Sequence, residues 1–366
     1  MAHGGVVTYR SPGSDVRLHQ RVTQSEVAKR LAPIKKMSFA GDFDPASRPA
    51  GSLYFVPDDT LLGSEAERLG IHGEHDLFGG VVPHRFIATK TITHPLLHAD
   101  SYAPEGWTHR FGAEVCDLVL PGFSAFSLTD ALGAGMQLLD RGTVRIKPAG
   151  GSGGLGQLTV ADAAQLQDAL RSLDGDAITR DGLVVEPNLE AAETFSVGQL
   201  RVADLLVSYC GSQHLTLNRH GEQVYGGSDL VVVRGDFATL LELPLSKSLR
   251  NAIAQARAFD DAVLACYDGT FASRRNYDIA QGMDNDGDDC SGVLEQSWRI
   301  GGASPAEVLA LEAFQAESRL DAVRASTTEI YELFVPPPDA FVFFRDVDPH
   351  VGPLTKFAQL RPYGDP

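Results

Sequence analysis

The chain has 366 residues, 43% of them hydrophobic, and a formal net charge of −17 at pH 7. Nucleic acid and anionic membranes need basic partner surfaces, and no apolar run approaches the roughly 18 residues of a membrane-spanning helix. The composition therefore predicts a globular protein of two or three subdomains that binds neither nucleic acid nor a membrane.

The amino-terminal region predicts two stretches of different character. Residues 1–30 are polar without clear periodicity, so we expect a loose leader, and they lack the charged and apolar regions of a secretion signal. Residues 31–85 contain strand-like runs at 37–43 and 53–56 and predict a small α/β unit. The four cysteines are widely spaced without a Cys-x-x-Cys pair, which indicates reduced thiols and a cytoplasmic protein.

Six of the eleven histidines lie between His72 and His109. The run from His72 to His75 lacks the helical spacing of a zinc protease, so we interpret these residues as loop histidines. Lys90 stands among threonines just before His94. Short hydroxyl side chains beside a lysine suit an anion, although a solvated loop would have the same composition.

A glycine-rich run after residue 147 is the clearest functional signal. Residues 128–139 predict a helix that Gly142 closes, and a short strand-like segment then ends at Lys147. Five glycines follow in residues 150–156, namely Gly150, Gly151, Gly153, Gly154 and Gly156, with Ser152 between them. Backbone without Cβ atoms can approach a polyphosphate closely, and the lysine adds a point charge, so the run predicts nucleotide binding.

Three nucleotide-binding folds and a plain surface turn compete for this run. A Walker loop fails, because Gly-Lys-Ser/Thr is missing after Gly156. A Rossmann turn should lead directly into a helix, but residues 157–160 look strand-like; Asp174, at the distance of a ribose-binding acid, keeps this alternative open. The remaining fold is a hairpin that closes over ATP.

Acidic residues further along favour the hairpin. Glu186 ends the apolar run 183–187, and Asn188 and Glu193 follow it. Asp278 and Glu295 lie on two strand-like segments joined by a turn rich in Gly and Asp. Antiparallel pairing would bring the two carboxylates together, and carboxylates plus substrate phosphates are what Mg²⁺ takes in nucleotide sites. The turn itself lacks the ligand spacing of an EF-hand, so we expect a solvated hairpin tip.

Several flanking segments complete the prediction. Residues 225–229 include small residues that would allow a ligand to approach. They are either the wall of the binding site on the side of the acceptor substrate or a tight turn before a strand. Of the neighbouring arginines 274 and 275, we expect at least one, with Arg274 as the candidate, to face the phosphates. Ser246 caps a helix, a capping box at 304–307 opens a long helix towards Phe334, and residues 341–344 predict a late strand.

In this order of motifs the chain resembles the ATP-grasp superfamily of ATP-dependent carboxylate–amine ligases over about residues 86–303, and as a whole it looks like the bacterial DUF3182 family. The resemblance implies an α/β fold with an amino-terminal unit (31–85), a lid subdomain (86–190) and a larger carboxy-terminal subdomain (191–366). It further implies these site residues: Lys147, Lys90 and residues 150–156 at the ATP phosphates, Glu186 with Asn188 at the adenine, Glu193 at the ribose, Asp278 and Glu295 at Mg²⁺, and Arg299 at the acyl phosphate or substrate. Ser297 stands where the superfamily usually has a metal-binding Asn, which weakens one metal site.

The implied activity is a ligase that forms an acylphosphate from a carboxylate and joins it to an amine or similar nucleophile. Small carboxylates and amines would be its partners, ATP and Mg²⁺ its cofactors, and a homodimer stays open. Two alternatives remain: a nucleotide-binding sensor or scaffold without turnover, suggested by Ser297, and a Rossmann oxidoreductase using NAD(P).

Overall fold

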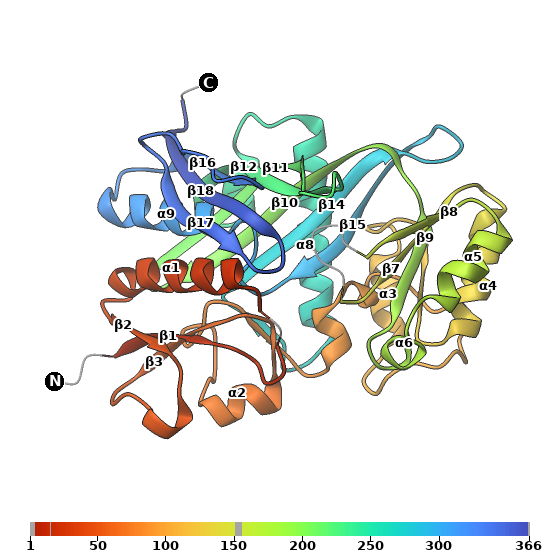
Figure 1. Ribbon diagram of the computed structural model, residues 1–366, viewed down its shortest axis with the longest axis horizontal. Helices are drawn as coiled ribbons and strands as arrows, with labels where there is room; N and C mark the ends of the chain where they lie inside the picture. Colours follow the sequence, from red (N-terminus) through yellow and green to blue (C-terminus); the bar gives the residue numbers. More distant parts are fainter. Residues whose placement is uncertain (1–3, 15, 151–155, 365–366) are drawn as a thin grey trace.

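The structure is a computed structural model that describes residues 4–14, 16–150 and 156–364. The described residues form four sheets. Figure 1 shows a small amino-terminal part, a part built on β7 and β9 at the other end of the long axis, and a large twisted sheet. In the described part of the chain, no helix has the length and apolar character needed to cross a membrane.

The amino-terminal part is a parallel sheet of order β2-β1-β3 with a helix against it. Its elements are β1 (Gly5–Tyr9), α1 (Leu18–Ile34), β2 (Ser38–Asp42), η1 (Pro45–Ser47) and β3 (Leu53–Pro57). The strands predicted at 37–43 and 53–56 are thus present. The loose leader is wrong for the described residues, because β1 and α1 occupy them. The sequence did not predict this helix because polar residues occupy part of its buried face. Gln24, for example, donates to the carbonyls of Tyr9 and Val56, so the buried positions lack an apolar periodicity.

Short elements connect this part to the rest. A small sheet of order β13-β5-β4 joins distant stretches of the chain. The elements here are β4 (Leu61–Leu62), α2 (Gly63–Leu69), β5 (Gly80–Val82), η2 (Arg85–Ala88), η3 (Lys90–Ile92), α3 (His109–Val115) and β13 (Phe271–Ala272). Because β13 directly precedes β14, this sheet holds the segment before Lys90 close to the large sheet.

The four-stranded part (residues 123–187) is an antiparallel sheet of order β6-β9-β7-β8 covered by helices. Its elements are β6 (Phe123–Ala125), α4 (Leu128–Leu139), β7 (Val144–Pro148), β8 (Leu158–Val160), α5 (Ala163–Arg171), α6 (Gly175–Asp181) and β9 (Leu183–Pro187). The helix predicted at 128–139 is α4, and Leu138 packs with Val144 and Leu166 in the core of this part. Strand β8 begins two residues after Gly156, so no helix follows the glycine run directly, as a Rossmann turn would require.

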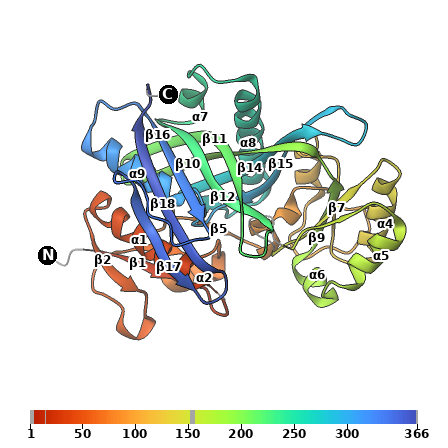
Figure 2. The ribbon, with the colours of Figure 1, turned by 45° about the horizontal axis from the view of Figure 1, so that its top comes forward.

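The large sheet has the order β15-β14-β10-β11-β12-β16-β18-β17. Its strands are β10 (Glu190–Val202), β11 (Leu205–Leu217), β12 (Gln223–Arg234), β14 (Arg274–Met283), β15 (Asp289–Ser297), β16 (Ala322–Ile330), β17 (Phe341–Asp348) and β18 (Gly352–Pro362). The late strand predicted at 341–344 is the start of β17. Figure 2 shows β16, β18 and β17 extending the sheet beyond β12.

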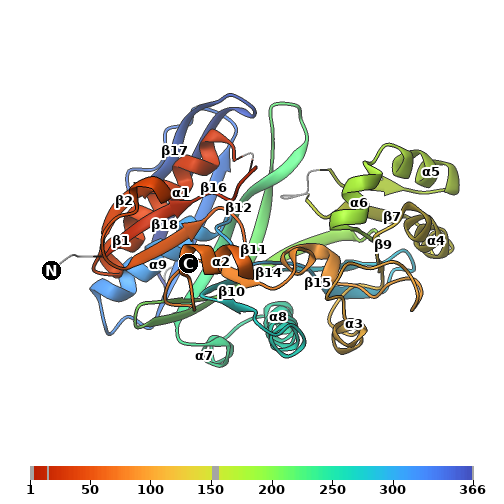
Figure 3. The same ribbon diagram turned by 90° about the horizontal axis from the view of Figure 1, so that it is seen from below.

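Helices cover both faces of the large sheet, as the view from below shows (Figure 3). On one face lie α3, α7 (Phe237–Leu241) and α8 (Lys247–Cys266), with Phe259 against Tyr277. On the other lie α1 and α9 (Ser304–Ala316). Ser246 caps α8 as predicted, accepting from the backbone N–H of Leu249.

The prediction for the helix after residue 304 was wrong in two respects. Helix α9 ends at Ala316, and residues on the way to Phe334 form β16 instead. Ser304 is not a cap, because its hydroxyl accepts from Gly301 N inside the preceding turn. Glu307 is fully buried and binds Arg274, so its carboxylate is unavailable for a capping box.

Candidate functional site

Two carboxylates face each other at the edge of the large sheet. Asp278 on β14 and Glu295 on β15 are direct cross-strand partners, as the sequence predicts. Residues paired in this way project from the same face of an antiparallel sheet, with Cβ atoms about 5 Å apart. A bulge between Asp278 and Ile279 shifts the register of the pair beyond this point. The pairing therefore brings together the two residues that the resemblance assigns to a metal ion.

Amide and hydroxyl groups surround Asp278. Its Oδ1 accepts from Gln213 Nε2 at 2.8 Å and from Asn276 Nδ2 at 2.9 Å, and Ser196 Oγ lies 3.5 Å away. Burial raises the pKa of Asp278 to about 6, and the neighbouring Glu295 carboxylate adds to the increase. The pKa of Asp278 is thus raised in the direction that the sequence predicts for a carboxylate beside another carboxylate.

Lys90 supplies a positive charge to this pair. Its Nζ lies 2.9 Å from Glu295 Oε2, and the side chain is 5% exposed. The neighbouring Gln296 donates to the carbonyls of Ile87 and Thr89, at 2.5 and 2.7 Å, and so fixes the backbone that carries Lys90. Glu295 thus binds the ammonium group of Lys90, and the adjacent Gln296 binds the backbone just before Lys90. Of the two interpretations of Lys90, the solvated loop is excluded by its burial.

A second buried charge cluster lies in the four-stranded part. Lys147 on β7 forms an ion pair with Glu186 on β9, and both side chains are almost completely buried. His94 Nε2 lies 3.2 Å from the other carboxylate oxygen of Glu186. Burial alone would raise the pKa of Glu186, but Lys147 and His94 together outweigh it and lower the pKa to about 2. Glu186 is therefore ionised and holds Lys147 in place.

His94 is the functional candidate that the sequence argument missed. It is fully buried, and its Nδ1 has no hydrogen-bond partner within the described part of the chain. Gly122 leaves room for the ring, because a Cβ there would lie 3.1 Å from His94 Cε1. The threonine-rich setting of Lys90 was the only signal, and it singled out the lysine.

The connection between the four-stranded part and the large sheet carries the remaining nucleotide candidates. Arg145 donates to the carboxamide oxygen of Asn188 from Nε and Nη2, at 3.1 and 2.5 Å, which orders the chain beyond β9. Glu193 is exposed on β10, next to a bulge in its pairing with β14. Gly156 has the left-handed φ of 76°. Gly151, Ser152, Gly153 and Gly154 lie outside the described residues.

The end of β15 is organised by Arg274. Its guanidinium is fully buried and binds Glu307 through two donors, at 2.7 and 3.0 Å. The third donor group binds the carbonyls of Ser297, at 3.0 Å, and of Arg299. Ser297 Oγ lies 3.5 Å from the same nitrogen. We expected Arg274 to face the phosphates; because these donors are engaged, we interpret it as a positioning residue for the 297–299 segment.

Arg299 itself is partly exposed. Its Nη1 donates to the carbonyl of Ile300 at 2.7 Å, and its Nε lies 3.9 Å from Asp59. Arg275, the other candidate, binds Asp260 at 2.8 Å. Of these three arginines, Arg299 is the one whose side chain is exposed by about a third, so it has room to contact a substrate.

A cluster of hydroxyl groups continues the polar surface across the large sheet. Tyr225 Oη lies 2.7 Å from Ser228 Oγ and 3.1 Å from Thr327 Oγ1. Burial raises the pKa of Tyr225, and the Glu329 and Asp278 carboxylates contribute in the same direction. Residues 225–228 are part of β12, so the tight turn is excluded there, whereas the acceptor-side wall is untested.

The donor set suits a hard divalent cation. In the described residues, no group of three or more His, Cys, Asp or Glu side chains could hold a metal ion without other ligands. A carboxylate pair is nevertheless what Mg²⁺ uses when substrate phosphates complete its shell. The raised pKa of Asp278 and the ammonium group on Glu295 both indicate a site that gains from positive charge.

Two further features lie away from these residues. The acidic turn between β14 and β15 contacts the four-stranded part, because Asn285 exchanges two 3.3 Å hydrogen bonds with the backbone of Thr143. It is therefore not purely a solvated tip.

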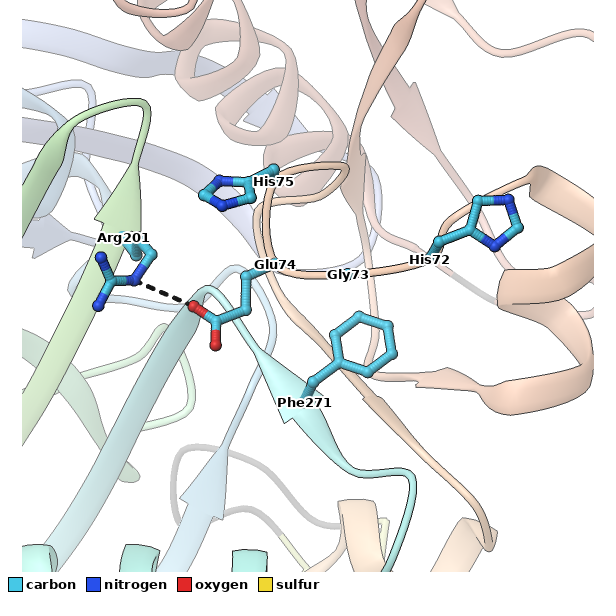
Figure 4. Close-up of a pocket in the computed structure, with 6 residues that line it drawn as sticks. All are labelled: His72, Gly73, Glu74, His75, Arg201 and Phe271. Carbon is cyan, nitrogen blue, oxygen red and sulfur yellow. Dashed lines mark ion pairs between the residues drawn. The ribbon is translucent and has the colours of Figure 1, made fainter.

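An open hollow of about 520 Å³ lies elsewhere, lined by His72, Gly73, Glu74, His75, Arg201 and Phe271 (Figure 4). Its carboxylate is neutralised by Arg201 at 3.2 Å and its histidines are exposed, as expected of loop residues.

Comparisons with known proteins agree with this architecture. The model of a family described as "Protein of unknown function (DUF3182)" matches residues 6–358. A search of curated proteins gives no match. The structure is similar to D-alanyl-alanine synthetase A from Vibrio cholerae, with a TM-score of 0.52 and 11% identity over 85% of this chain and 94% of the other. It is also similar to carboxyaminoimidazole ribonucleotide synthase from Aspergillus clavatus, solved with ATP, with a TM-score of 0.51 and 12% identity over 99% and 94%.

A third similar structure is the biotin carboxylase domain of the 2-oxoglutarate carboxylase from Hydrogenobacter thermophilus, solved with ADP, magnesium and bicarbonate. Its TM-score is 0.52 at 13% identity, covering 99% of this chain and 87% of the other. All three neighbours have the ATP-grasp fold. At such low identity the likeness shows the fold alone, and the predicted ATP-grasp architecture is confirmed.

Proposed function

This chain belongs to the DUF3182 family and has the ATP-grasp fold, and from its site we propose an ATP-dependent ligase that joins a small carboxylate to an amine or similar nucleophile. The observation that carries the proposal is the cross-strand pair of Asp278 and Glu295 with Lys90 on it. Three neighbours with this fold are solved enzymes, and two of them were solved with ATP or ADP.

We assign the nucleotide to the space between the four-stranded part and the large sheet. Lys147 and Lys90 would bind its phosphates from opposite sides, with the run of residues 150–156 beside Lys147. Glu186, Asn188 and Glu193 lie on or next to the connection between the two parts, where the resemblance puts adenine and ribose. An ammonium group has three N–H donors, so each buried lysine can bind phosphate oxygens without giving up its carboxylate partner.

Asp278 and Glu295 would hold Mg²⁺, which when bound neutralises phosphate charge. The chain's own residues prepare the site for it. Gln213 orients the Asp278 carboxylate by a hydrogen bond of 2.8 Å, and Lys90 orients Glu295. Ser297 offers only a hydroxyl, a weaker ligand than a carboxylate or carboxamide oxygen. Arg274 fixes the segment that presents Arg299.

The reaction balances in two displacements. A carboxylate oxygen of the substrate bonds to the terminal phosphorus of ATP, and the bond from that phosphorus to ADP breaks. The amine nitrogen then bonds to the acyl carbon, loses a proton, and phosphate leaves. Such chemistry depends on positioning and on charge stabilisation by groups such as Arg299 and Lys90, and it needs no nucleophilic side chain of the protein.

The test has a binding arm and a turnover arm. Isothermal titration should show tight binding of Mg-ATP and none of NAD(H), and phosphate release should appear with one member of a pooled set of carboxylates and amines. Asp278→Asn should lose the Mg²⁺ dependence while keeping the fold. Arg201→Gln, at the distant hollow, is the matched control and should change neither. Preference for NAD(H) would contradict the proposal.

A nucleotide sensor or scaffold without turnover is the second candidate, and Ser297 is the observation that favours it. It predicts ATP binding without phosphate release for every substrate pair. Ser297→Asn would then strengthen metal binding and still give no phosphate.

A further inference from the structure

Asn276 lies beside the carboxylate pair in the same row of side chains. It is directly opposite Ser297 across the β14–β15 ladder, as Asp278 is opposite Glu295. Residues two apart on a strand share a face, so these four side chains form a square on one face of the sheet. Asn276 is 7% exposed. A carboxamide thus faces the position where the hydroxyl of Ser297 makes a weak ligand.

A glycine allows a tyrosine to reach this carboxamide across an intervening strand. Gly198 on β10 is the neighbour of both Asn276 and Tyr209. Any Cβ at Gly198 would lie 2.3 Å from Tyr209 Cζ, so the ring passes over this position. Tyr209 Oη reaches Asn276 Oδ1 at 2.8 Å and Glu307 Oε1 at 2.7 Å.

Counting protons shows that one of these two contacts lacks a hydrogen. A tyrosine hydroxyl has a single proton. Glu307 accepts from the guanidinium of Arg274 through both oxygens, and a carboxylate oxygen attracts the tyrosine proton more strongly than an amide oxygen does. The oxygen of Asn276 therefore faces Tyr209 Oη without a proton between them.

Turning the carboxamide by 180° gives Tyr209 an N–H donor and removes this conflict. It also places the carboxamide oxygen of Asn276 next to an oxygen of Asp278. The two ends of a carboxamide have nearly the same shape, so the network decides its orientation. The turned group would donate from Nδ2 to Tyr209 and place its oxygen against Asp278 Oδ1, where the nitrogen now lies at 2.9 Å. Two acceptor oxygens at this separation repel each other unless a proton or a cation lies between them. In an octahedral Mg²⁺ site with bonds of about 2.1 Å, adjacent oxygens are about 3 Å apart.

We propose that Asn276 is the third protein ligand of the divalent cation, with its carboxamide oxygen turned towards Asp278. This assignment rests on the proposed nucleotide-dependent function of the same site. Asn276 supplies from β14 the amide oxygen that position 297 on β15 lacks. Gln213 continues to donate to Asp278 in this arrangement, and Tyr209 keeps its proton on Glu307 while accepting from Asn276.

The test exchanges the two side chains across the ladder. Mn²⁺ binding is measured by electron paramagnetic resonance in the presence of a non-hydrolysable ATP analogue, and folding by thermal unfolding in EDTA. Asn276→Ser should weaken Mn²⁺ at least as much as the 10- to 100-fold typical for losing an outer-shell partner. The double variant Asn276→Ser with Ser297→Asn should recover most of the loss, whereas Ser297→Ala alone should change affinity less than about threefold.

Each result decides the assignment. If Asn276→Ser binds Mn²⁺ as tightly as wild type, or if the exchange variant recovers nothing, Asn276 is not a ligand. Should Asn276→Ser not fold, Asn276→Asp serves instead, and it must bind Mn²⁺ more tightly than wild type, because it adds a charged oxygen at the site. If the wild-type protein binds neither Mn²⁺ nor the nucleotide, both the proposed function and the assignment of Asn276 are wrong. If the variants bind the nucleotide normally and their Mn²⁺ affinity is unaltered, only the assignment of Asn276 is wrong.

Discussion

Replacing Lys147 by methionine should affect stability and nucleotide binding separately. The side chain is 4% exposed and its partner Glu186 is 3% exposed, so the methionine leaves a buried carboxylate with only His94 beside it. Breaking a buried ion pair in this way costs about 3–5 kcal/mol. The pKa of Glu186 agrees in direction, because a decrease from 4.5 to about 2 favours the charged form by about 3 kcal/mol at 1.36 kcal/mol per pKa unit, with Lys147 and His94 together outweighing burial.

A double variant separates the two effects. In Lys147→Met with Glu186→Gln both charges are absent, so most of the lost stability should return, since neutral replacement of a buried pair is often tolerated. Nucleotide affinity should not return, because one charge-assisted phosphate contact is worth about 1.5–3 kcal/mol, or roughly 10- to over 100-fold. Urea unfolding followed by circular dichroism gives the first quantity and calorimetric titration of an ATP analogue the second.

The pH dependence gives a further check on the same pair. Because the folded state depresses the pKa of Glu186, its stabilisation is complete above pH 4.5 and is lost as the pH falls towards 2. Wild type should therefore lose more stability over this interval than the double variant. The reasoning is refuted if Lys147→Met unfolds at the wild-type urea concentration, or if the double variant binds the nucleotide normally.

Three other changes test further parts of the site and of the fold. Lys90→Met should raise the Mn²⁺ affinity of the nucleotide-free protein, because Glu295 loses an ammonium neighbour, and should weaken ATP binding about tenfold or more by titration; equal affinities would contradict this. Burial lowers the pKa of His19, on α1, to about 3, so stability should be complete above pH 6.5 and fall by about 3 kcal/mol by pH 4.5, at about 1.36 kcal/mol per pH unit, and His19→Gln should flatten this dependence in urea unfolding. Arg274→Met should destabilise the fold by about 3–5 kcal/mol by leaving Glu307 buried and unpaired, whereas a small effect would mean that the pair is dispensable.

Local patterns in the sequence were enough to predict that Asp278 and Glu295 pair across two strands. Asp278 and Glu295 each lie on an alternating segment, and the Gly- and Asp-rich turn between them leaves antiparallel pairing as the simple solution, which the structure has. The helix at 128–139, the cap at Ser246 and strand β17 follow from equally local signals. In each case, neighbouring residues determine the outcome.

Predictions failed where distant residues decide the role of a side chain. Glu307 has the spacing of a capping residue, but its partners Arg274 and Tyr209 come from β14 and β11, and a buried ion pair outweighs a cap. Helix α1 was not predicted because its buried Gln24 interrupts the apolar pattern, and the side-chain amide of Gln24 donates to backbone carbonyls of β1 and β3. His94 could not be assigned, since Glu186 is 92 residues further along the chain.

The charge distribution explains how a chain of net charge −17 can suit a polyphosphate. Net charge governs long-range attraction, which is screened beyond about 8–10 Å in physiological salt, whereas binding depends on the cations within contact distance. Two such cations, Lys90 and Lys147, are each nearly buried and each held by one carboxylate, Glu295 and Glu186. Each carboxylate places an opposite charge beside its buried ammonium group, and burial of a charge without such a partner is costly. Acidic residues are thus what allows the proposed site to hold two positive charges before a phosphate arrives, because an ammonium group with three N–H donors can contact a carboxylate and a phosphate together.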